Sequence, residues 1–374
     1  MDLSLYNYSL LVSIPLMLFF GFHMLLGRTP EKDIFSNFLL SRRMMGTALL
    51  ILSANYCVHL FYGIRLKDTN ATILMNLSTY FICYWLFSAA MRTLLDSRYV
   101  TRRRFARHIA MWTAFSATAG TVLLSDWDKE MEKAGLSILA LWLVGYGLFL
   151  AMRLLKTYTK AVKMFEDTHS DDIESYIQWL SVFTYWAVGY GLSCGLLTFL
   201  PNRYIFLWVL SSIPFYIYLY CCYQNYILFY ERVEEALQED LAISETEATK
   251  EEEDRLYNDN ETPPYYAEIE SHMEEWIESG GYLKAGITIN SLSAELKTNR
   301  SYLSEYINTI YGKSFRNWIA DLRIEHAKRI MKENPYLKIQ VIAESSGFLS
   351  INHFTKTFSD REGCTPGKWK RTAM

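Results

Sequence analysis

The sequence predicts an all-α protein in which a bundle of membrane helices precedes a smaller helical domain. Three observations support this prediction in a chain of 374 residues. Seven apolar stretches follow one another in residues 1–229, and polar breaks separate them. A strongly acidic segment comes next. Near the C-terminus, two short motifs with apolar residues at helical spacing superpose at an offset of 51 residues.

The apolar stretches are long enough to span a bilayer. A helix of about 20 residues crosses a hydrocarbon core of about 30 Å. The stretches lie near residues 5–26, 44–64, 72–94, 105–124, 136–155, 177–200 and 204–226. We therefore expect residues 1–229 to form a seven-helix transmembrane domain in contact with membrane lipids.

Basic residues are unevenly divided between the two sets of loops. The loops after the first, third and fifth stretches hold 12 of them: Arg28, Lys32, Arg42, Arg43, Arg98, Arg102, Arg103, Arg104, Arg153, Lys156, Lys160 and Lys163. The alternate loops hold five: Arg65, Lys67, Lys129, Lys133 and Arg203. Because cytoplasmic loops are enriched in Lys and Arg, this predicts an N-terminus outside and a C-terminal domain in the cytoplasm.

Polar residues within the apolar stretches are candidates for a ligand site. Asn55 and His59 lie one turn apart on the second stretch. Such residues at membrane depth bind ligands or protons, or form hydrogen bonds between helices, and both interpretations stay open. None of the six cysteines forms a CxxC pair, so we expect no metal site and no cofactor.

The connector, residues 230–264, is predicted to be a juxtamembrane helix followed by a linker. Residues 231–279 hold 18 acidic and 3 basic side chains. Apolar residues at helical spacing over 226–241 predict a coiled coil that pairs two chains, or else a single solvated helix. Residues 242–264 have the composition of a flexible acidic linker. This linker either competes with nucleic acid for the basic domain that follows or keeps the chain soluble.

The C-terminal domain, residues 265–374, is basic and predicted to contain two helix-turn-helix units. Residues 282–374 hold 15 basic and 8 acidic side chains. Helices are expected near 265–278, 291–296, 314–332 and 339–346, with one exposed helix after each short turn. Leu303 precedes Gly312 by nine residues in one copy, as Phe354 precedes Gly363 in the other.

This region resembles the AraC/XylS family of bacterial transcription regulators over residues 265–371. The motifs that match are Tyr302-Leu303-Ser304, Gly312-Lys313-Ser314-Phe315, Arg323 with Ala327, Ile342-Ala343 with Gly347-Phe348, His353-Phe354 with Phe358, and Gly363-Cys364-Thr365-Pro366. Ser293 stands where the family usually has alanine, and Lys356 where it has arginine. The resemblance implies a homeodomain-like double helix-turn-helix whose two recognition helices enter successive major grooves, about 34 Å apart.

The predicted interface with double-stranded DNA has two kinds of contact. Opposite the apolar Leu303 and Phe354, the exposed helix faces carry the predicted base contacts Ser301, Ser304, Glu305, Asn352, His353 and Lys356. The predicted phosphate contacts are Arg300, Lys313, Arg316, Lys368, Lys370 and Arg371.

Together these features predict a membrane-bound, sequence-specific transcription regulator in the bacterial inner membrane. A small molecule or a membrane signal would act on the bundle and alter the DNA-binding domain. Two alternatives stay open: a regulator that is only tethered by the bundle, and a membrane transporter or enzyme with an appended DNA-binding domain. Because no nucleophile or acid–base pair stands out, we expect the protein not to be an enzyme.

Overall fold

The fold was analysed in a computed structural model that describes residues 2–96, 98–125, 127–170, 174–197, 204–254 and 265–372. These residues are helical or lie in turns, and the described part of the chain forms no extended strand. The chain divides into two compact units. The N-terminal unit comprises Met1–Lys160 and Tyr176–Leu237, and the C-terminal unit comprises Ala161–Ser175 and Gln238–Met374.

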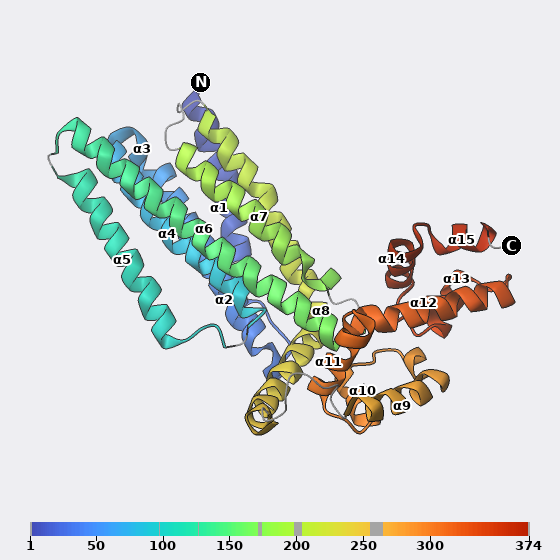
Figure 1. Ribbon diagram of the computed structural model, residues 1–374. Coiled ribbons are helices and arrows are strands. Elements are labelled where there is room, and N and C mark those ends of the chain that lie inside the picture. Colours follow the sequence, from blue (N-terminus) through green and yellow to red (C-terminus); the bar gives the residue numbers. More distant parts are fainter. Residues whose placement is uncertain are drawn as a thin grey trace. The chain divides into compact units, whose positions relative to one another are not determined.

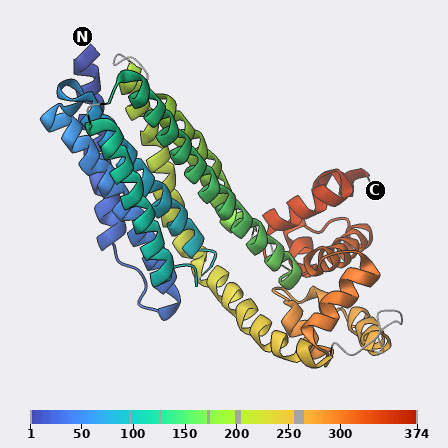
Figure 2. The same cartoon turned by 60° about the vertical axis from the view of Figure 1, so that its left-hand side comes forward.

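The N-terminal unit consists of long helices that run side by side (Figures 1 and 2). Over the residues that the structure describes, each predicted apolar stretch lies mainly on one long helix, and residues 198–200 of the sixth stretch lie outside the described residues. In chain order the elements are α1 Asp2–Leu26, η1 Asp33–Phe35, α2 Ser36–Tyr62, α3 Ile64–Lys67, α4 Thr69–Thr93, α5 Arg102–Leu124, α6 Lys129–Thr168, α7 Glu174–Leu197 and α8 Ile205–Asp254.

Among the described residues, five helices are long and apolar enough to cross a membrane. They are α1, α2, α4, α6 and the first part of α8. Helix α5 falls outside this group because Arg107, His108 and several Ser and Thr residues lower its apolar content. Helix α7 also falls outside it over the part that the structure describes. The seven predicted spans are thus seven helices, of which five have the length and composition of a membrane span.

Helix α8 is longer than the sequence predicts, and the first residues of the stretch 226–241, predicted to pair two chains, are buried. It continues through Asp254, so residues 242–254 of the predicted linker are helical. Tyr226 and Tyr230 are 2% and 0% exposed inside the N-terminal unit. The Tyr230 ring packs on Phe35 and Phe38, with ring centroids 5.5 and 5.2 Å away. These two tyrosines are therefore packed inside the N-terminal unit, and pairing of two chains over 226–241 stays a prediction.

The helices predicted near 265–278, 291–296, 314–332 and 339–346 are present with boundaries that differ by at most two residues, and the short elements at 281–283 and 366–372 are additional. After residue 264, the C-terminal unit consists of a series of small helices. They are α9 Tyr265–Glu278, η3 Gly281–Leu283, α10 Ile289–Glu295, α11 Arg300–Tyr311, α12 Phe315–Glu333, α13 Ile339–Ser345, α14 Ile351–Glu362 and α15 Pro366–Thr372. Helices α10 and α11 form the first helix-turn-helix, and α13 and α14 form the second. Helix α12 connects them.

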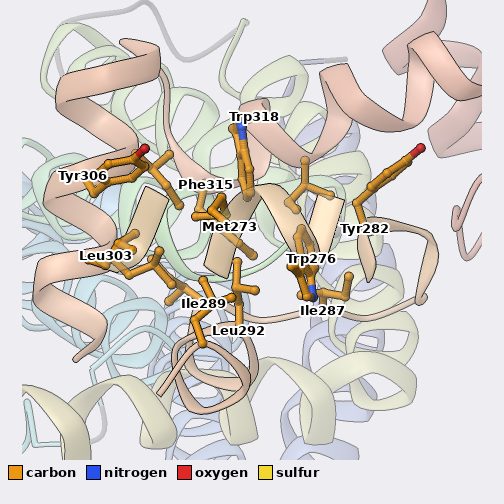
Figure 3. Packing of buried hydrophobic residues seen from close by; sticks show 14 of the residues in the cluster. Met273, Trp276, Tyr282, Ile287, Ile289, Leu292, Leu303, Tyr306, Phe315 and Trp318 are labelled. Atoms are coloured by element: carbon orange, nitrogen blue, oxygen red, sulfur yellow. The ribbon is translucent and has the colours of Figure 1, made fainter. Parts of the chain in front are cut away.

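Each helix-turn-helix has its own apolar core, and α12 contributes to both. The first core gathers side chains from α9, α10, α11 and the start of α12, including Trp276, Leu303 and Trp318 (Figure 3). The second gathers the later part of α12 with α13 and α14, including Phe354 and Phe358 at 0% exposure. One continuous helix, α12, therefore sets the orientation of the two helix-turn-helix motifs relative to each other.

A buried arginine joins the two cores. Arg323 on α12 is 1% exposed, and its Nε and Nη2 donate to the carbonyl oxygens of Tyr282 and Lys284 at 2.9 and 2.7 Å. Gly347, in the turn of the second unit, has φ +80°, and a Cβ added there would lie 2.7 Å from the Leu283 oxygen. The turn of one unit thus lies against the loop of the other, and only glycine fits there.

Candidate nucleic-acid interface

The two exposed helices, α11 and α14, begin and end in the same way. The Asn299 side chain accepts from the Ser301 amide at 2.8 Å, and the Ser350 side chain accepts from the His353 amide at 3.2 Å. Both helices end at a left-handed glycine, Gly312 at φ 64° and Gly363 at φ 69°. Side-chain caps and αL glycines delimit helices in this way, so the two copies share a local structure.

Buried anchors determine which face of each helix is exposed. Leu303 and Ile307 on α11 are 0% exposed, as are Phe354 and Phe358 on α14. Residues on the opposite side of each helix consequently face outward. The faces that the sequence predicts to contact bases therefore lie opposite the buried anchors on both helices.

On α11, the predicted base contacts have partners within the protein. Glu305 is exposed and accepts a hydrogen bond from the Tyr265 hydroxyl of α9 at 2.9 Å. The Tyr265 ring stacks on Tyr302 with centroids 4.0 Å apart. Burial and the Glu305 carboxylate raise the pKa of Tyr265, so its hydroxyl stays protonated. Ser301 and Ser304 are half-buried.

On α14, Asn352 and Lys356 are exposed, whereas His353 is half-buried with its ring 5.5 Å from Phe348 in an edge-on contact. Ile351 has the helical spacing of the buried Phe354 and Phe358, but it is 42% exposed at the first position of α14. An exposed apolar side chain beside Asn352 can contact a thymine methyl group.

The predicted phosphate contacts fall into two groups. Lys368 and Arg371 are exposed on α15, and Arg371 Nε donates to the Gly367 oxygen at 3.2 Å. Lys370 Nζ donates to the Leu337 oxygen. Two of the other three form ion pairs within the same unit: Lys313 pairs with Asp321 at 2.7 Å, and Arg316 with Glu166 at 3.8 Å. Arg300 interacts electrostatically with Asp167, whose pKa is raised by burial, with Lys163 and Arg300 acting in the opposite direction.

Asp321 on α12 connects the two helix-turn-helix motifs. Its carboxylate accepts from Lys313, just after α11, at 2.7 Å and from Arg361 of α14 at 2.5 Å. Burial acts to raise the pKa of Asp321, but the hydrogen bonds from these two cations outweigh it and hold the pKa below its usual value. The ionised carboxylate thus fixes both recognition helices to one point of α12.

Comparison with known proteins covers this same region. Residues 292–372 match the family model of a helix-turn-helix domain. This part of the chain is a helix-turn-helix domain.

Its relatives are transcriptional regulators and not enzymes. Over 86 residues (23% of this chain, 35% of the relative) it is 34% identical to the uncharacterized HTH-type transcriptional regulator YobQ of Bacillus subtilis. Over 105 residues (28% and 38%) it is 31% identical to the virulence regulon transcriptional activator VirF of Yersinia enterocolitica. Over 80 residues (21% and 28%) it is 32% identical to the regulator ExsA of Pseudomonas aeruginosa. The chain thus spans 28% to 38% of the length of these relatives, and no solved structure matches it significantly.

In the N-terminal unit, the predicted ligand residues form hydrogen bonds between helices. Asn55 and His59 on α2 are each 5% exposed. Asn55 Nδ2 donates to Asn76 Oδ1 at 3.1 Å and to Thr79 Oγ1 at 3.2 Å, and His59 Nε2 lies 3.0 Å from Asn76 Oδ1. The polar partners on α4 were missed because nothing in sequence pairs one helix with another. A ligand role for Asn55 and His59 stays a prediction.

The same unit contains a cavity of about 130 Å³ between α2, α4, α6, α7 and α8. None of the residues that line it is charged, and its polar groups are hydroxyls such as those of Tyr84, Ser88 and Tyr216, with the Cys83 thiol. Among the described residues no group of His, Cys, Asp and Glu side chains could hold a metal ion. The cavity therefore suits a small, uncharged and mainly apolar molecule.

Proposed function

We propose that the protein is a membrane-bound, sequence-specific transcription regulator that binds double-stranded DNA through α11 and α14. The observation that supports this most strongly is the pair of capped, outward-facing helices that α12 and Asp321 hold in one unit. Asn352 can pair with adenine, Lys356 with guanine acceptors, and Ile351 with a thymine methyl group. Lys368, Lys370 and Arg371 on α15 contact phosphates beside this helix.

Genome-wide mapping of the DNA bound by the full chain in cells tests this function. We expect discrete sites with a shared motif whose two elements lie about one helical turn apart. Asn352→Ala/Lys356→Ala should abolish the motif. Arg329→Ala, which removes an exposed charge of α12 outside the predicted interface, should leave the sites unchanged. Enrichment without any motif, or the same sites in the double variant, would contradict the proposal.

The N-terminal unit is proposed to span the bacterial inner membrane several times, with the N-terminus outside and residues 265–374 in the cytoplasm. Five apolar helices and the distribution of basic loop residues support this arrangement. A green fluorescent protein fused after Met374 should fluoresce, and a tag before Met1 should be cleaved by protease added to spheroplasts. A C-terminal fusion that is dark but active as an exported reporter would refute the orientation.

A sensing role for this unit is supported by the cavity. An uncharged ligand from the membrane phase would enter it without the cost of burying a charge. Ala187→Trp would fill the cavity, and an unrelated anchor could replace residues 1–230. If the unit senses a signal, both variants lose the condition-dependent change in target transcripts that wild type shows by RNA sequencing. If the exchange of the anchor leaves that change intact, the bundle acts only as a tether.

A further inference from the structure

Helix α6 extends well beyond the apolar stretch that it contains. The stretch ends near residue 155, whereas α6 continues to Thr168. These 13 additional residues extend the helix by about 20 Å. The last of them, from Ala161, belong to the C-terminal unit together with the helix-turn-helix domain.

The backbone just after α6 is bonded to the start of the first helix-turn-helix. Ser170 N donates to the Ile287 oxygen at 3.0 Å, and His169 forms an antiparallel bridge with Thr288. Thr288 is the capping residue of α10. Thr168 and Ser170 are 0% and 2% exposed. This short segment is therefore packed into the unit and does not lie loosely on its surface.

Two carboxylates of this segment lie at the arginines predicted to contact phosphates. Glu166 Oε1 lies 3.8 Å from Arg316 Nη1, and the Arg316 side chain is 15% exposed. Burial raises the pKa of Asp167, and the positive charges of Lys163 and Arg300 act in the opposite direction. Arg300 is the first residue of α11, and Arg316 is the second residue of α12. Both arginines lie at helix N-termini, where phosphates of DNA also bind.

We propose that Arg300 and Arg316 form a shared binding surface that accepts either DNA phosphates or the acidic end of α6. This inference rests on the proposed DNA-binding function. A carboxylate and a phosphate oxygen use the same guanidinium donors, so the two ligands exclude each other. While the end of α6 is bound, the first helix-turn-helix lacks two of its phosphate contacts. Anything that withdraws α6 from this surface raises DNA affinity, and bound DNA displaces α6 to the same extent.

The first test neutralises the end of α6 in the full-length chain, reconstituted in nanodiscs. The probe is a fluorescent 30-base-pair duplex of random sequence at low salt, because such binding depends on phosphate contacts. Glu166→Gln/Asp167→Asn should tighten binding about fivefold, since the ion pair of Glu166 with Arg316 and the attraction of Asp167 for Arg300 are removed from the competing state. Glu130→Gln/Glu132→Gln makes the same charge change in the first turn of α6 and should leave the affinity at the wild-type value.

The second test locks the segment in place. Opposite residues of an antiparallel bridge have Cα atoms about 4.5–5.5 Å apart, within the range of a disulfide. His169→Cys/Thr288→Cys should therefore cross-link on mild oxidation, lose at least tenfold in affinity for the same duplex, and recover it on reduction. Excess duplex should lower the yield of cross-link. Thr288→Cys alone controls for the altered cap of α10 and for the native cysteines.

Three results would overturn the proposal: no cross-link, a cross-linked chain that binds DNA as well as the reduced one, or an unchanged affinity of the Glu166/Asp167 variant. Failure of the underlying function has a different signature. In that case no variant binds duplex at any salt concentration, while the cross-link forms with a yield that DNA does not affect.

Discussion

The two helix-turn-helix units arise from the same sequence pattern but differ in what covers them. In the first unit, Glu305 is hydrogen-bonded to Tyr265, and Arg316 faces the end of α6. In the second unit, Asn352 and Lys356 are exposed on α14. In the first helix-turn-helix, protein groups therefore contact two residues that are predicted to contact DNA. In the function that we propose, α14 provides the more exposed reading surface, and the first helix-turn-helix is the proposed point of control.

The largest effect is expected from truncating the equivalent buried side chains of the two helix-turn-helix motifs, Leu303 and Phe354. Phe354→Ala should cost about 3–5 kcal/mol and Leu303→Ala about 2–5 kcal/mol of the free energy of unfolding, because both side chains are fully buried. Urea denaturation of the full chain in detergent, followed by tryptophan fluorescence, measures both. Ile310→Ala at a 52% exposed site of α11 is the matched control. A Phe354→Ala variant as stable as this control would show that the second core is not packed as described.

Arg323→Met should be next, because it affects both units at once. The substitution leaves the Tyr282 and Lys284 oxygens without their buried donor, which costs about 1–3 kcal/mol for each unsatisfied group. Hydrogen exchange should rise in the loop near residue 283 and in the turn at Gly347 together. Arg329→Met on the exposed side of α12 should change neither. Protection lost in one unit alone would separate the units that we describe as coupled.

Lys356→Ala tests the reading surface of the second unit. The loss of a base contact should cost about 1–3 kcal/mol on the genomic motif and relax preference at one base position. Binding to random duplex should change little. Lys368→Ala, a predicted phosphate contact, should instead weaken binding to all duplexes and reduce the salt dependence. An equal loss on all DNA from Lys356→Ala would reassign this residue to a phosphate.

Asp321→Asn tests the bridge between the units through its pH dependence. Asp321 is partly exposed, so we expect a cost of about 1 kcal/mol after solvent screening. Because its pKa is lowered in the folded state, the carboxylate stabilises the fold above its unfolded pKa, near 4. The advantage of wild type over Asp321→Asn should therefore hold at pH 7 and disappear as pH falls below 4. An advantage that persists at pH 2 would exclude the ionised carboxylate as its source.

The smallest expected effect concerns the hydrogen bond from Tyr265 to Glu305 on α11. Tyr265→Phe removes the hydroxyl that donates to Glu305, which should change the free energy of unfolding by about 0.5–1 kcal/mol. It also leaves the carboxylate available to a cytosine amino group, so affinity for the genomic motif should rise about twofold, with preference sharpened at one base. Tyr336→Phe, at a 96% exposed tyrosine, is the control for loss of a hydroxyl. Unchanged preference would remove Glu305 from the base contacts.

Much of the C-terminal fold could be predicted because its signals are local. Helix 265–278 was predicted with the bounds that the structure has, and the repeat from Leu303 to Gly312 and from Phe354 to Gly363 reappears as two helices ending at αL glycines. Apolar spacing, caps and glycines act within a few residues, so they can be read from a single sequence. The acidic linker was the poorest case, since helix α8 extends to Asp254 through residues whose composition favours solvation.

The sequence by itself determined which helices form and which of their faces are apolar, because both depend on neighbours within one or two turns. Only the tertiary structure decided the partners: Tyr265 for Glu305, Asn76 for Asn55 and His59, Arg323 for the Tyr282 and Lys284 oxygens, and Glu166 for Arg316. The last pair joins residues 150 positions apart in sequence. In a chain of this length, a charged or amide side chain could pair with many other groups. Which partner it contacts is decided by how the helices pack. For that reason the two exposed helices could be predicted from the residues, whereas the contact of Glu166 with Arg316 could not.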